Sequence, residues 1–369
     1  MNNMTESLTA PTPIASPTVN PMGLDGFEFV EYASPEPEKL EKLFLSLGFT
    51  PIAQHRSKKV TLFRQGKINF ILNQEPHSHA AHFSQQHGPS ACAMAFKVQD
   101  AQKAFARAVA LGAKPFTDAK NGPQETTIPA IYGIGGSLLY FVDHLDHQHN
   151  RSIYDSDFIP FEGVSQSPPG AGLLYIDHLT HNVHQGEMDT WAHFYEHIFN
   201  FQEIRYFDIE GQKTGLISRA LASPCGKIKI PLNESKDDHS QIEEYLKEYK
   251  GEGIQHVALV PQDIYTTVET LQATGTKFLT TPNTYYEMVN DRVKNHAEDL
   301  VRMQKDQILI DGTVDNHREN LLLQIFTENV IGPIFFEIIQ RKGNQGFGEG
   351  NFKALFEAIE RDQIRRGVL

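Results

Sequence analysis

The chain has little cysteine and no long apolar run, and both shortages limit what it can be. Its two cysteines, Cys92 and Cys225, are far apart and form no CxxC pair, which argues against a disulfide framework and a thiolate zinc site. No apolar segment is long enough to cross a bilayer. The first residues lack a basic start and an apolar core and are rich in Pro, Thr and Ser. We therefore expect a flexible tail over 1–22, no secretory signal and a cytoplasmic protein.

Basic side chains are also scarce relative to acidic ones. The chain has 33 Lys and Arg against 46 Asp and Glu, a formal net charge of -13. This balance disfavours nucleic acid and anionic membranes as partners, but it does not exclude a small anionic substrate, because one metal ion can reverse the local field. A length of 369 residues with 40% hydrophobic and 21% charged residues predicts a soluble globular protein of two or three domains.

The same order of elements occurs twice along the chain. A short strand, a helix, a glycine and a second strand begin near Asp25 and again near Tyr175, the first helix being expected over Pro37–Leu47. A related pattern with an aspartate before its helix surrounds Asp100 and Asp263. The sequence therefore predicts an α+β protein made of four repeated βαβββ-type modules, two in each half.

The halves meet in the Pro- and Gly-containing stretch 162–172. We expect an N-terminal structural domain over 23–160 and a C-terminal catalytic domain over 170–369. Four such modules resemble the vicinal-oxygen-chelate superfamily, in which paired modules curl their sheets around a metal. The resemblance implies two open β-barrel domains.

A carboxylate inside a hydrophobic strand suggests where the metal lies. In FFEIIQRKG, Glu337 shares a strand face with Phe335 and Ile339, so it needs a cationic partner, a proton or a metal. His178 and His256 open corresponding strands of two successive modules in the same half. Two histidines and one carboxylate form the facial triad of non-haem Fe(II) oxygenases. Alone, each histidine is more often a core residue. The alternative partner of Glu337 is an arginine or a lysine, for example Arg205 or Arg219.

Other histidines fit a metal site less well. His181 should project to the face opposite His178, so we expect it to be structural or to support a ligand from behind. The histidine-rich stretches 77–87 and 144–149 look like solvated loops. In the first half, the positions corresponding to the triad are Gly26 or Glu28, Ala93 and Tyr140, so we expect no metal there.

The sequence from about Met22 to Leu369 closely resembles the 4-hydroxyphenylpyruvate dioxygenase family, especially its bacterial members. The shared motifs occur in the family's order: IDHLTHNV, IPLNE, SQIEEYL, GEGIQHVA, LLLQIF, FFEIIQRKG and GFGEGNFKALFEAIERDQIRRGVL. The resemblance implies the ligands His178, His256 and Glu337, one Fe(II) per chain, and conversion of 4-hydroxyphenylpyruvate and O2 to homogentisate and CO2 in tyrosine catabolism. It also suggests a homo-oligomer, either a dimer or a tetramer.

The resemblance further implies a substrate pocket. Polar residues that act on or orient the substrate are Gln324, Gln241, Asn233, Ser218 and, ranked lower because a regular strand would point it away from His256, Gln255. The aromatic walls are Phe335, Phe347 and Phe352. A glycine-rich hinge precedes a helix over about 351–366, with Asn351 as its expected N-cap, which we expect to close the site.

Three other functions remain open on the sequence. A hydroxymandelate synthase would use the same substrate, metal and triad. A metal lyase or isomerase of the glyoxalase type would usually need four protein ligands, and this half offers three. A non-catalytic binding module on the same scaffold would lack the triad.

Overall fold

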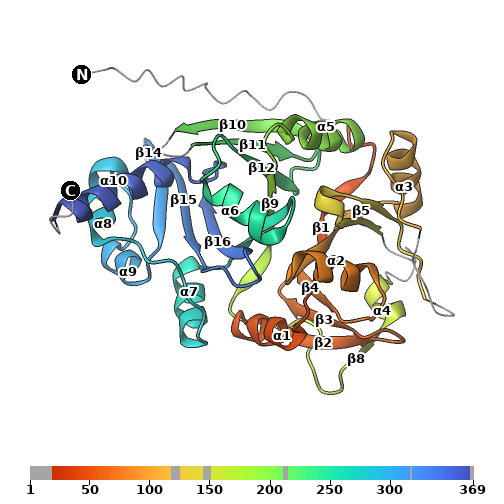
Figure 1. The fold of residues 1–369 in the computed structure, drawn as a ribbon. Coiled ribbons are helices and arrows are strands. Elements are labelled where there is room, and N and C mark those ends of the chain that lie inside the picture. Colours follow the sequence, from red (N-terminus) through yellow and green to blue (C-terminus); the bar gives the residue numbers. More distant parts are fainter. Residues whose placement is uncertain (1–18, 118–124, 144–150, 211–214, 316–317, 366–369) are drawn as a thin grey trace.

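The computed structural model describes residues 19–117, 125–143, 151–210, 215–315 and 318–365, and these ranges contain two eight-stranded mixed sheets with helices packed around them (Figure 1). The strand order is β6-β7-β5-β1-β4-β3-β2-β8 in the first sheet and β10-β11-β12-β9-β13-β16-β15-β14 in the second. The second sheet curls into a half-barrel, with α10 and α8 beyond its β14 edge (Figure 1). The predicted α+β class is confirmed.

The strands of the first sheet are β1 (Leu24–Ala33), β2 (Thr50–His55), β3 (Val60–Gln65), β4 (Ile68–Asn73), β5 (Ser90–Val98), β6 (Ala130–Tyr132), β7 (Leu138–Val142) and β8 (Phe158–Pro160). Those of the second are β9 (Leu173–Val183), β10 (Gln202–Glu210), β11 (Gly215–Ala222), β12 (Lys229–Ser235), β13 (Gly253–Pro261), β14 (Leu309–Asp315), β15 (Arg318–Phe326) and β16 (Phe335–Lys342). The helices are α1 (Pro37–Ser46), α2 (His79–His87), α3 (Ala101–Ala110), α4 (Ile153–Asp157), α5 (Met188–Phe199), α6 (Gln241–Tyr249), α7 (Ile264–Ala273), α8 (Asn283–Arg292), α9 (Leu300–Lys305) and α10 (Glu349–Arg365). None of these described helices is long and apolar enough to span a bilayer.

The modules repeat the same strand pairing. In each, the first strand runs parallel to the last: β1 with β4, β5 with β7, β9 with β12 and β13 with β16. Neighbouring modules join through antiparallel first strands, β1 with β5 and β9 with β13. Two details depart from the expected βαβββ pattern. The second module has three strands in the described residues, and the fourth has α8 and α9 inserted before β14.

Two aspartates that the sequence singled out do begin equivalent helices. Asp100 accepts a hydrogen bond from the backbone N–H of Lys103 at the start of α3. Asp263 accepts one from the N–H of Thr266 at the start of α7. Each carboxylate satisfies a backbone donor that the helix leaves unpaired, which explains why an aspartate precedes both helices.

Strand register shows what replaces the triad in the first half. In the second sheet Ala258 pairs with both His178 and Glu337. In the first sheet Ala95 pairs with both Phe29 and Tyr140. Phe29 and Tyr140 therefore occupy the places of His178 and Glu337.

Ala93, two residues before that alanine, takes the place of His256. The predicted Ala93 and Tyr140 are correct, but Gly26 or Glu28 is wrong, because register shifts within β1 move the equivalent position to Phe29. The rings of Phe29 and Tyr140 lie 5.6 Å apart in an apolar cluster. Aromatic side chains therefore fill this region in the first half, whereas the corresponding positions in the second half carry the polar triad.

The first histidine-rich stretch is also different from the prediction. Residues from His79 to His87 form helix α2 rather than a solvated loop. His87 is buried, its Nδ1 lies 2.7 Å from the carbonyl oxygen of Tyr249, and its ring packs against that tyrosine. His87 thus joins the first half to α6 of the second. The stretch 144–149 falls outside the described residues.

Candidate metal centre and substrate site

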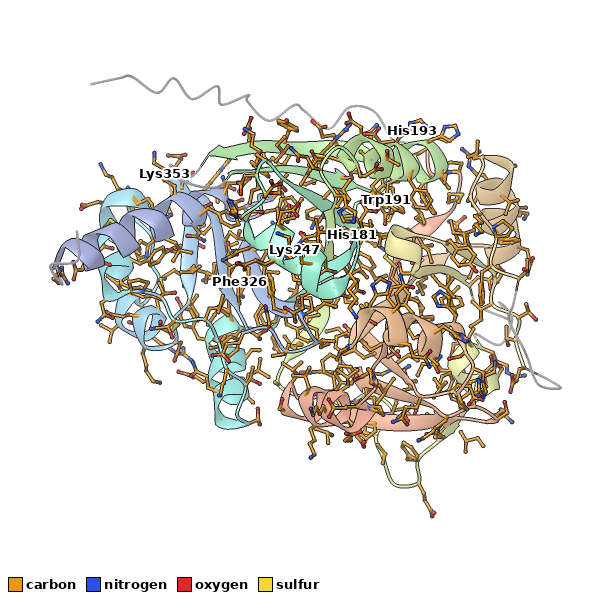
Figure 2. The ribbon with its side chains drawn as sticks, in the orientation of Figure 1. His181, Trp191, His193, Lys247, Phe326 and Lys353 are labelled. Atoms are coloured by element: carbon orange, nitrogen blue, oxygen red, sulfur yellow. The ribbon has the colours of Figure 1, made fainter. Side chains whose placement is uncertain are left out.

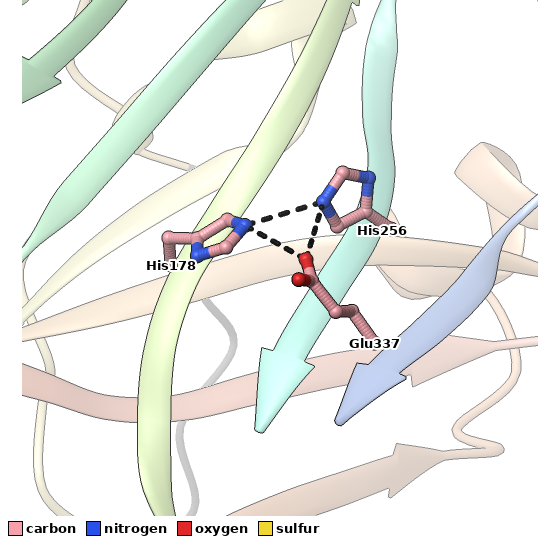
Figure 3. Close-up of side chains that lie close together, drawn as sticks. All are labelled: His178, His256 and Glu337. Atoms are coloured by element: carbon pink, nitrogen blue, oxygen red, sulfur yellow. Dashed lines mark hydrogen bonds and ion pairs between the residues drawn. The ribbon is translucent and has the colours of Figure 1, made fainter. Parts of the chain in front are cut away.

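The three predicted ligands meet at one point in the second half-barrel (Figure 3). His178 lies on β9, His256 on β13 and Glu337 on β16, three neighbouring strands of the sheet. The Nε2 atoms of the two histidines are 3.3 Å apart, and Glu337 Oε2 lies 3.2 Å from that of His178 and 3.4 Å from that of His256. His178 and Glu337 are each 2% exposed.

The shape and chemistry of this donor set fit a metal ion. Bonds of about 2.1 Å that meet at right angles or tetrahedral angles separate their donor atoms by about 3.0 to 3.4 Å. The observed triangle has edges of 3.2 to 3.4 Å. Two neutral imidazole nitrogens and one carboxylate oxygen also suit first-row divalent metals.

Two bulges orient the histidine rings. On β13 the pairing passes from Ile254 to His256 while β9 advances one residue, so Gln255 is extra. On β9 it passes from His178 to Ile176 while β13 advances one residue, so Asp177 is extra. A bulge lets neighbouring side chains leave the strict alternation of a strand.

Each bulged residue contacts its neighbouring histidine. Gln255 Oε1 lies 2.9 Å from His256 Nδ1, and Asp177 Oδ2 lies 2.8 Å from His178 Nδ1. The Nδ1–H group therefore donates to the acceptor, which leaves Nε2 free to face the common point. The expectation that Gln255 points away from His256 is wrong, because the strand is not regular there.

Burial and the two histidines shift the pKa of Glu337 in opposite directions. Burial raises the pKa of this carboxyl group, but hydrogen bonds and positive charge from His178 and His256 outweigh it and lower the pKa to about 2. Burial lowers the pKa of His178, yet contacts with Asp177 and Glu337 leave it raised overall. For His256 burial dominates, so its pKa is lowered. In the described residues, the direct ion pairs of this carboxylate are therefore with the two histidines.

The arginines considered as alternative partners lie elsewhere. Arg219 pairs with Asp189, Glu196 and Glu203. Arg205 lies 4.0 Å from Glu349. His181, labelled in Figure 2, faces away from the triad as predicted, because its Nε2 lies 2.8 Å from the hydroxyl of Tyr195 on α5.

The aromatic residues proposed as pocket walls divide into two groups. The ring of Phe335 stacks on His256 with centroids 4.8 Å apart. The ring of Phe347 meets His178 edge-on at 5.2 Å. Phe352, by contrast, is 42% exposed on the first turn of α10, and no described ring contact joins it to the triad.

The polar residues proposed for the pocket are also spread out. Gln324 Nε2 donates to Glu337 Oε1 at 3.3 Å, so it reaches the triad directly. Ser218 and Asn233 face each other as a cross-strand pair of β11 and β12 and are half-buried. Gln241 is exposed at the start of α6. In the described contacts, none of these last three touches a metal-ligand candidate.

The expected N-cap of the last helix has another role. Helix α10 begins at Glu349, two residues earlier than predicted, so Asn351 lies inside it. Asn351 is buried, donates to Gln324 Oε1 at 3.0 Å and accepts from the hydroxyl of Tyr285 at 2.6 Å. Its side chain links α10 to the candidate site instead of capping the N-terminus of the helix.

Sequence reasoning missed two further residues on β9. Thr180 Oγ1 lies 3.0 Å from His256 Nε2. Asn182 is fully buried, pairs with Asn233 on β12, and has no hydrogen-bond partner in the described residues for either amide atom. Both alternate onto the face of His178, a signal that the sequence already contained.

Comparisons with known proteins find relatives for both halves of the chain. Family models match residues 18–159, as the hydroxyphenylpyruvate dioxygenase N-terminal family, and residues 175–289, as the glyoxalase/bleomycin resistance protein/dioxygenase superfamily. A hemolysin VllY from Vibrio vulnificus is 59% identical over 95% of this chain and 98% of its own. A 4-hydroxyphenylpyruvate dioxygenase from Pseudomonas aeruginosa is 59% identical over 95% of this chain and 97% of its own. A solved variant of 4-hydroxymandelate synthase from Streptomyces coelicolor has a TM-score of 0.77 and 26% identity, covering 93% of this chain and all of that one.

Proposed function

The chain belongs to the 4-hydroxyphenylpyruvate dioxygenase family of enzymes, and on this premise we propose that it uses one Fe(II) to convert 4-hydroxyphenylpyruvate and O2 to homogentisate and CO2. The observation that carries the proposal is the convergence of His178, His256 and Glu337 from three adjacent strands. Three protein ligands leave coordination positions for a substrate and O2. A set of three protein ligands disfavours a glyoxalase-type lyase, which usually needs a fourth. The presence of the triad also disfavours a non-catalytic binding module, which would lack it.

The chain itself would bind, orient and shield the reactants. His178, His256 and Glu337 would hold the iron, which when bound supplies the oxygen chemistry. Phe335 and Phe347, whose rings contact the two histidines, would wall the aromatic ring of the substrate. Helix α10 would exclude water while it is docked.

Polar side chains would fix the substrate's orientation. Gln324 would act next to the triad, because it already donates to Glu337. Ser218 and Asn233 form a half-buried pair that would hold polar substrate groups, with Gln241, Gln255 and Phe352 as further proposed contacts. The buried amide of Asn182 has unused hydrogen-bonding capacity on the same strand face as His178.

Hydroxymandelate synthesis is the second candidate. The similarity to a solved 4-hydroxymandelate synthase favours it, because the two chains share a fold over nearly their whole lengths. That reaction would use the same triad and differ only in which substrate carbon receives oxygen.

We also propose the wider setting of the enzyme. The reaction would serve tyrosine and phenylalanine catabolism in the cytoplasm, and the chain would form a homo-oligomer, a dimer or a tetramer. Within each chain, 23–160 would be the structural domain and 170–369 the catalytic one. Sedimentation of the purified protein tests the assembly, since a monomer at micromolar concentration would contradict it.

Metal replacement tests the proposed chemistry. The metal-free protein is loaded under argon with Fe(II), Zn(II) or Mn(II), and O2 uptake is followed after 4-hydroxyphenylpyruvate is added. We expect uptake with Fe(II) alone, because zinc has no accessible redox chemistry. Equal turnover with zinc would support a lyase or isomerase instead.

A further inference from the structure

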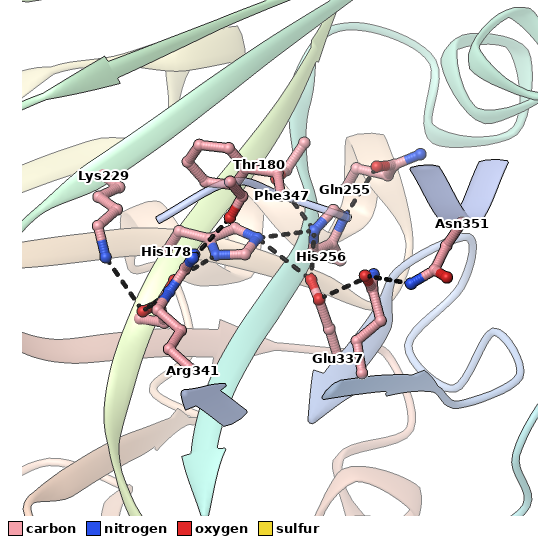
Figure 4. A network of polar contacts seen from close by, with 12 residues as sticks. His178, Thr180, Lys229, Gln255, His256, Glu337, Arg341, Phe347 and Asn351 are labelled. Atoms are coloured by element: carbon pink, nitrogen blue, oxygen red, sulfur yellow. Dashed lines mark hydrogen bonds and ion pairs between the residues drawn. The ribbon is translucent and has the colours of Figure 1, made fainter. Parts of the chain in front are cut away.

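Asp177, the bulged neighbour of His178, is a buried carboxylate with several partners. It is 4% exposed. Its Oδ2 lies 2.8 Å from His178 Nδ1 and 2.9 Å from Arg341 Nη2, and its Oδ1 lies 3.0 Å from Arg341 Nε and 3.1 Å from Lys229 Nζ (Figure 4). A buried carboxylate can keep its charge when every oxygen is paired in this way. Asp177 therefore fixes the His178 ring and is itself fixed by Arg341.

Arg341 also holds the chain that leads to the last helix. It lies four residues after Glu337 on β16, so the two share a strand face. Its Nη1 donates to the carbonyl oxygens of Asn344 at 3.1 Å and Gly346 at 2.5 Å. Its guanidinium lies over the ring of Phe347, 5.4 Å from the centroid. One side chain thus contacts Asp177 and the loop 343–348 together.

The loop 343–348 and the first turn of α10 also contact Gln324, which leads to a second ligand candidate, Glu337. Asn351, in the first turn of α10, donates to Gln324, and Gln324 donates to Glu337. Gly348 has φ +81°, and a Cβ at that position would lie 1.6 Å from Gln324 Oε1. The loop can approach Gln324 this closely only because a glycine stands there.

We propose that Arg341 is a positioning residue that couples docking of the segment 343–365 to metal binding. Arg341 holds Asp177 on His178 and holds the Phe347 loop over the same histidine. Metal binding and docking of the segment therefore stabilise each other. The inference rests on the proposed function in that the triad binds a metal. Coupling between two sites is reciprocal: if docking tightens metal binding by some factor, the metal favours docking by that factor.

The test compares three arginine variants with the wild type. Arg341→Met removes the charge and all donors, and Arg341→Lys keeps a charge for Asp177 but lacks the planar set of donors that reaches the loop. Arg302→Met is the matched control, because Arg302 also binds a carboxylate with two nitrogens, that of Glu269, and lies over a ring, that of Tyr265. It lies on α9, away from the triad.

Two quantities are measured for each protein without substrate. Co(II) titration gives metal affinity, and hydrogen exchange of the α10 amides is followed with and without Co(II). In the wild type and Arg302→Met, we expect Co(II) to slow α10 exchange about tenfold or more. In Arg341→Met we expect metal affinity to fall about 10- to 100-fold, as for other residues that orient ligands, and the metal effect on α10 to vanish. Arg341→Lys should recover affinity more fully than it recovers the effect on α10.

The outcomes separate this inference from the proposed function. If the wild type binds no metal at the triad, the proposed function fails. If the wild type binds Co(II) but its α10 exchange does not change, or Arg341→Met behaves as Arg302→Met does, the coupling is refuted. Should Arg341→Met not fold by circular dichroism, Asp177→Asn replaces it, since asparagine keeps the shape and one acceptor for His178. Unchanged affinity and α10 coupling in Asp177→Asn would equally refute the inference.

Discussion

Replacing Glu337 by Gln removes a charge from the centre of the site with little change of shape. Gln can still accept the hydrogen bond from Gln324, so the main loss is the attraction between the carboxylate and the histidines. The pKa of Glu337 is lowered from 4.5 to about 2. A difference of about 2.5 units at about 1.36 kcal/mol per unit corresponds to about 3 kcal/mol of stability at pH 7. This contribution is present above pH 4.5 and is lost as the pH falls toward 2.

Urea unfolding of the metal-free protein at pH 7 measures that loss. We expect Glu337→Gln to unfold with a free energy lower by about 3 kcal/mol. Fe(II) added under argon at 100 times its dissociation constant should stabilise the wild type by about 2.7 kcal/mol and the variant by nothing measurable. Glu269→Gln is the control, because Arg302 also lowers the pKa of Glu269 to about 2, but on the surface; its gain from Fe(II) should equal that of the wild type. An equal metal-dependent gain in Glu337→Gln would refute the ligand assignment, and an unchanged metal-free stability would refute the electrostatic reasoning.

Three further changes test neighbouring parts of the site. Burial lowers the pKa of His181 to about 3, so this histidine takes up a proton on unfolding, and the unfolding free energy of the wild type should fall by about 2 kcal/mol between pH 6.5 and 5. Urea unfolding of His181→Gln should show a smaller fall over this range, and an equal fall would contradict this. Gln255→Leu removes the acceptor for His256 Nδ1 and should weaken Co(II) binding about 10- to 100-fold. The control Gln272→Leu, at an exposed position, should not weaken it, and equal Co(II) affinities of the two variants would show that Gln255 does not orient the ligand. Asn351→Ala leaves the buried Gln324 Oε1 without its donor and should lower the unfolding free energy by about 1 to 3 kcal/mol, which a loss under about 0.5 kcal/mol would contradict.

Repetition made the fold predictable from the sequence. Strand and helix periodicity, together with Asp100 and Asp263 before equivalent helices, was enough to identify the four modules. The convergence of His178, His256 and Glu337 followed from their places in equivalent strands, because equivalent strands of joined modules lie side by side in one sheet.

Features that depend on strand irregularity could not be predicted. A bulge changes which way a side chain points, and no residue pattern marked the bulges at Asp177 and Gln255. Gln255 was therefore expected to face away from His256. The shifts in β1 likewise moved the first-half equivalent of His178 to Phe29.

Long-range contacts account for the remaining differences. Asn351 resembles an N-cap in local sequence, but hydrogen bonds to Tyr285 and Gln324 place it inside α10. The histidines from His79 to His87 resemble a polar surface loop, but His87 is buried by contact with Phe83 of the same helix and with Tyr249 of the other half. Tyr285, Gln324 and Tyr249 are all far from their partners in sequence.

Product analysis distinguishes the proposed dioxygenase reaction from its alternatives. The protein is loaded with Fe(II) under argon and mixed with 4-hydroxyphenylpyruvate and air, while O2 uptake is recorded and the products are separated by chromatography. We expect one homogentisate for each O2 consumed. Formation of 4-hydroxymandelate would contradict the proposed product while keeping the triad, and no O2 uptake by the folded, iron-loaded protein would contradict the dioxygenase function itself.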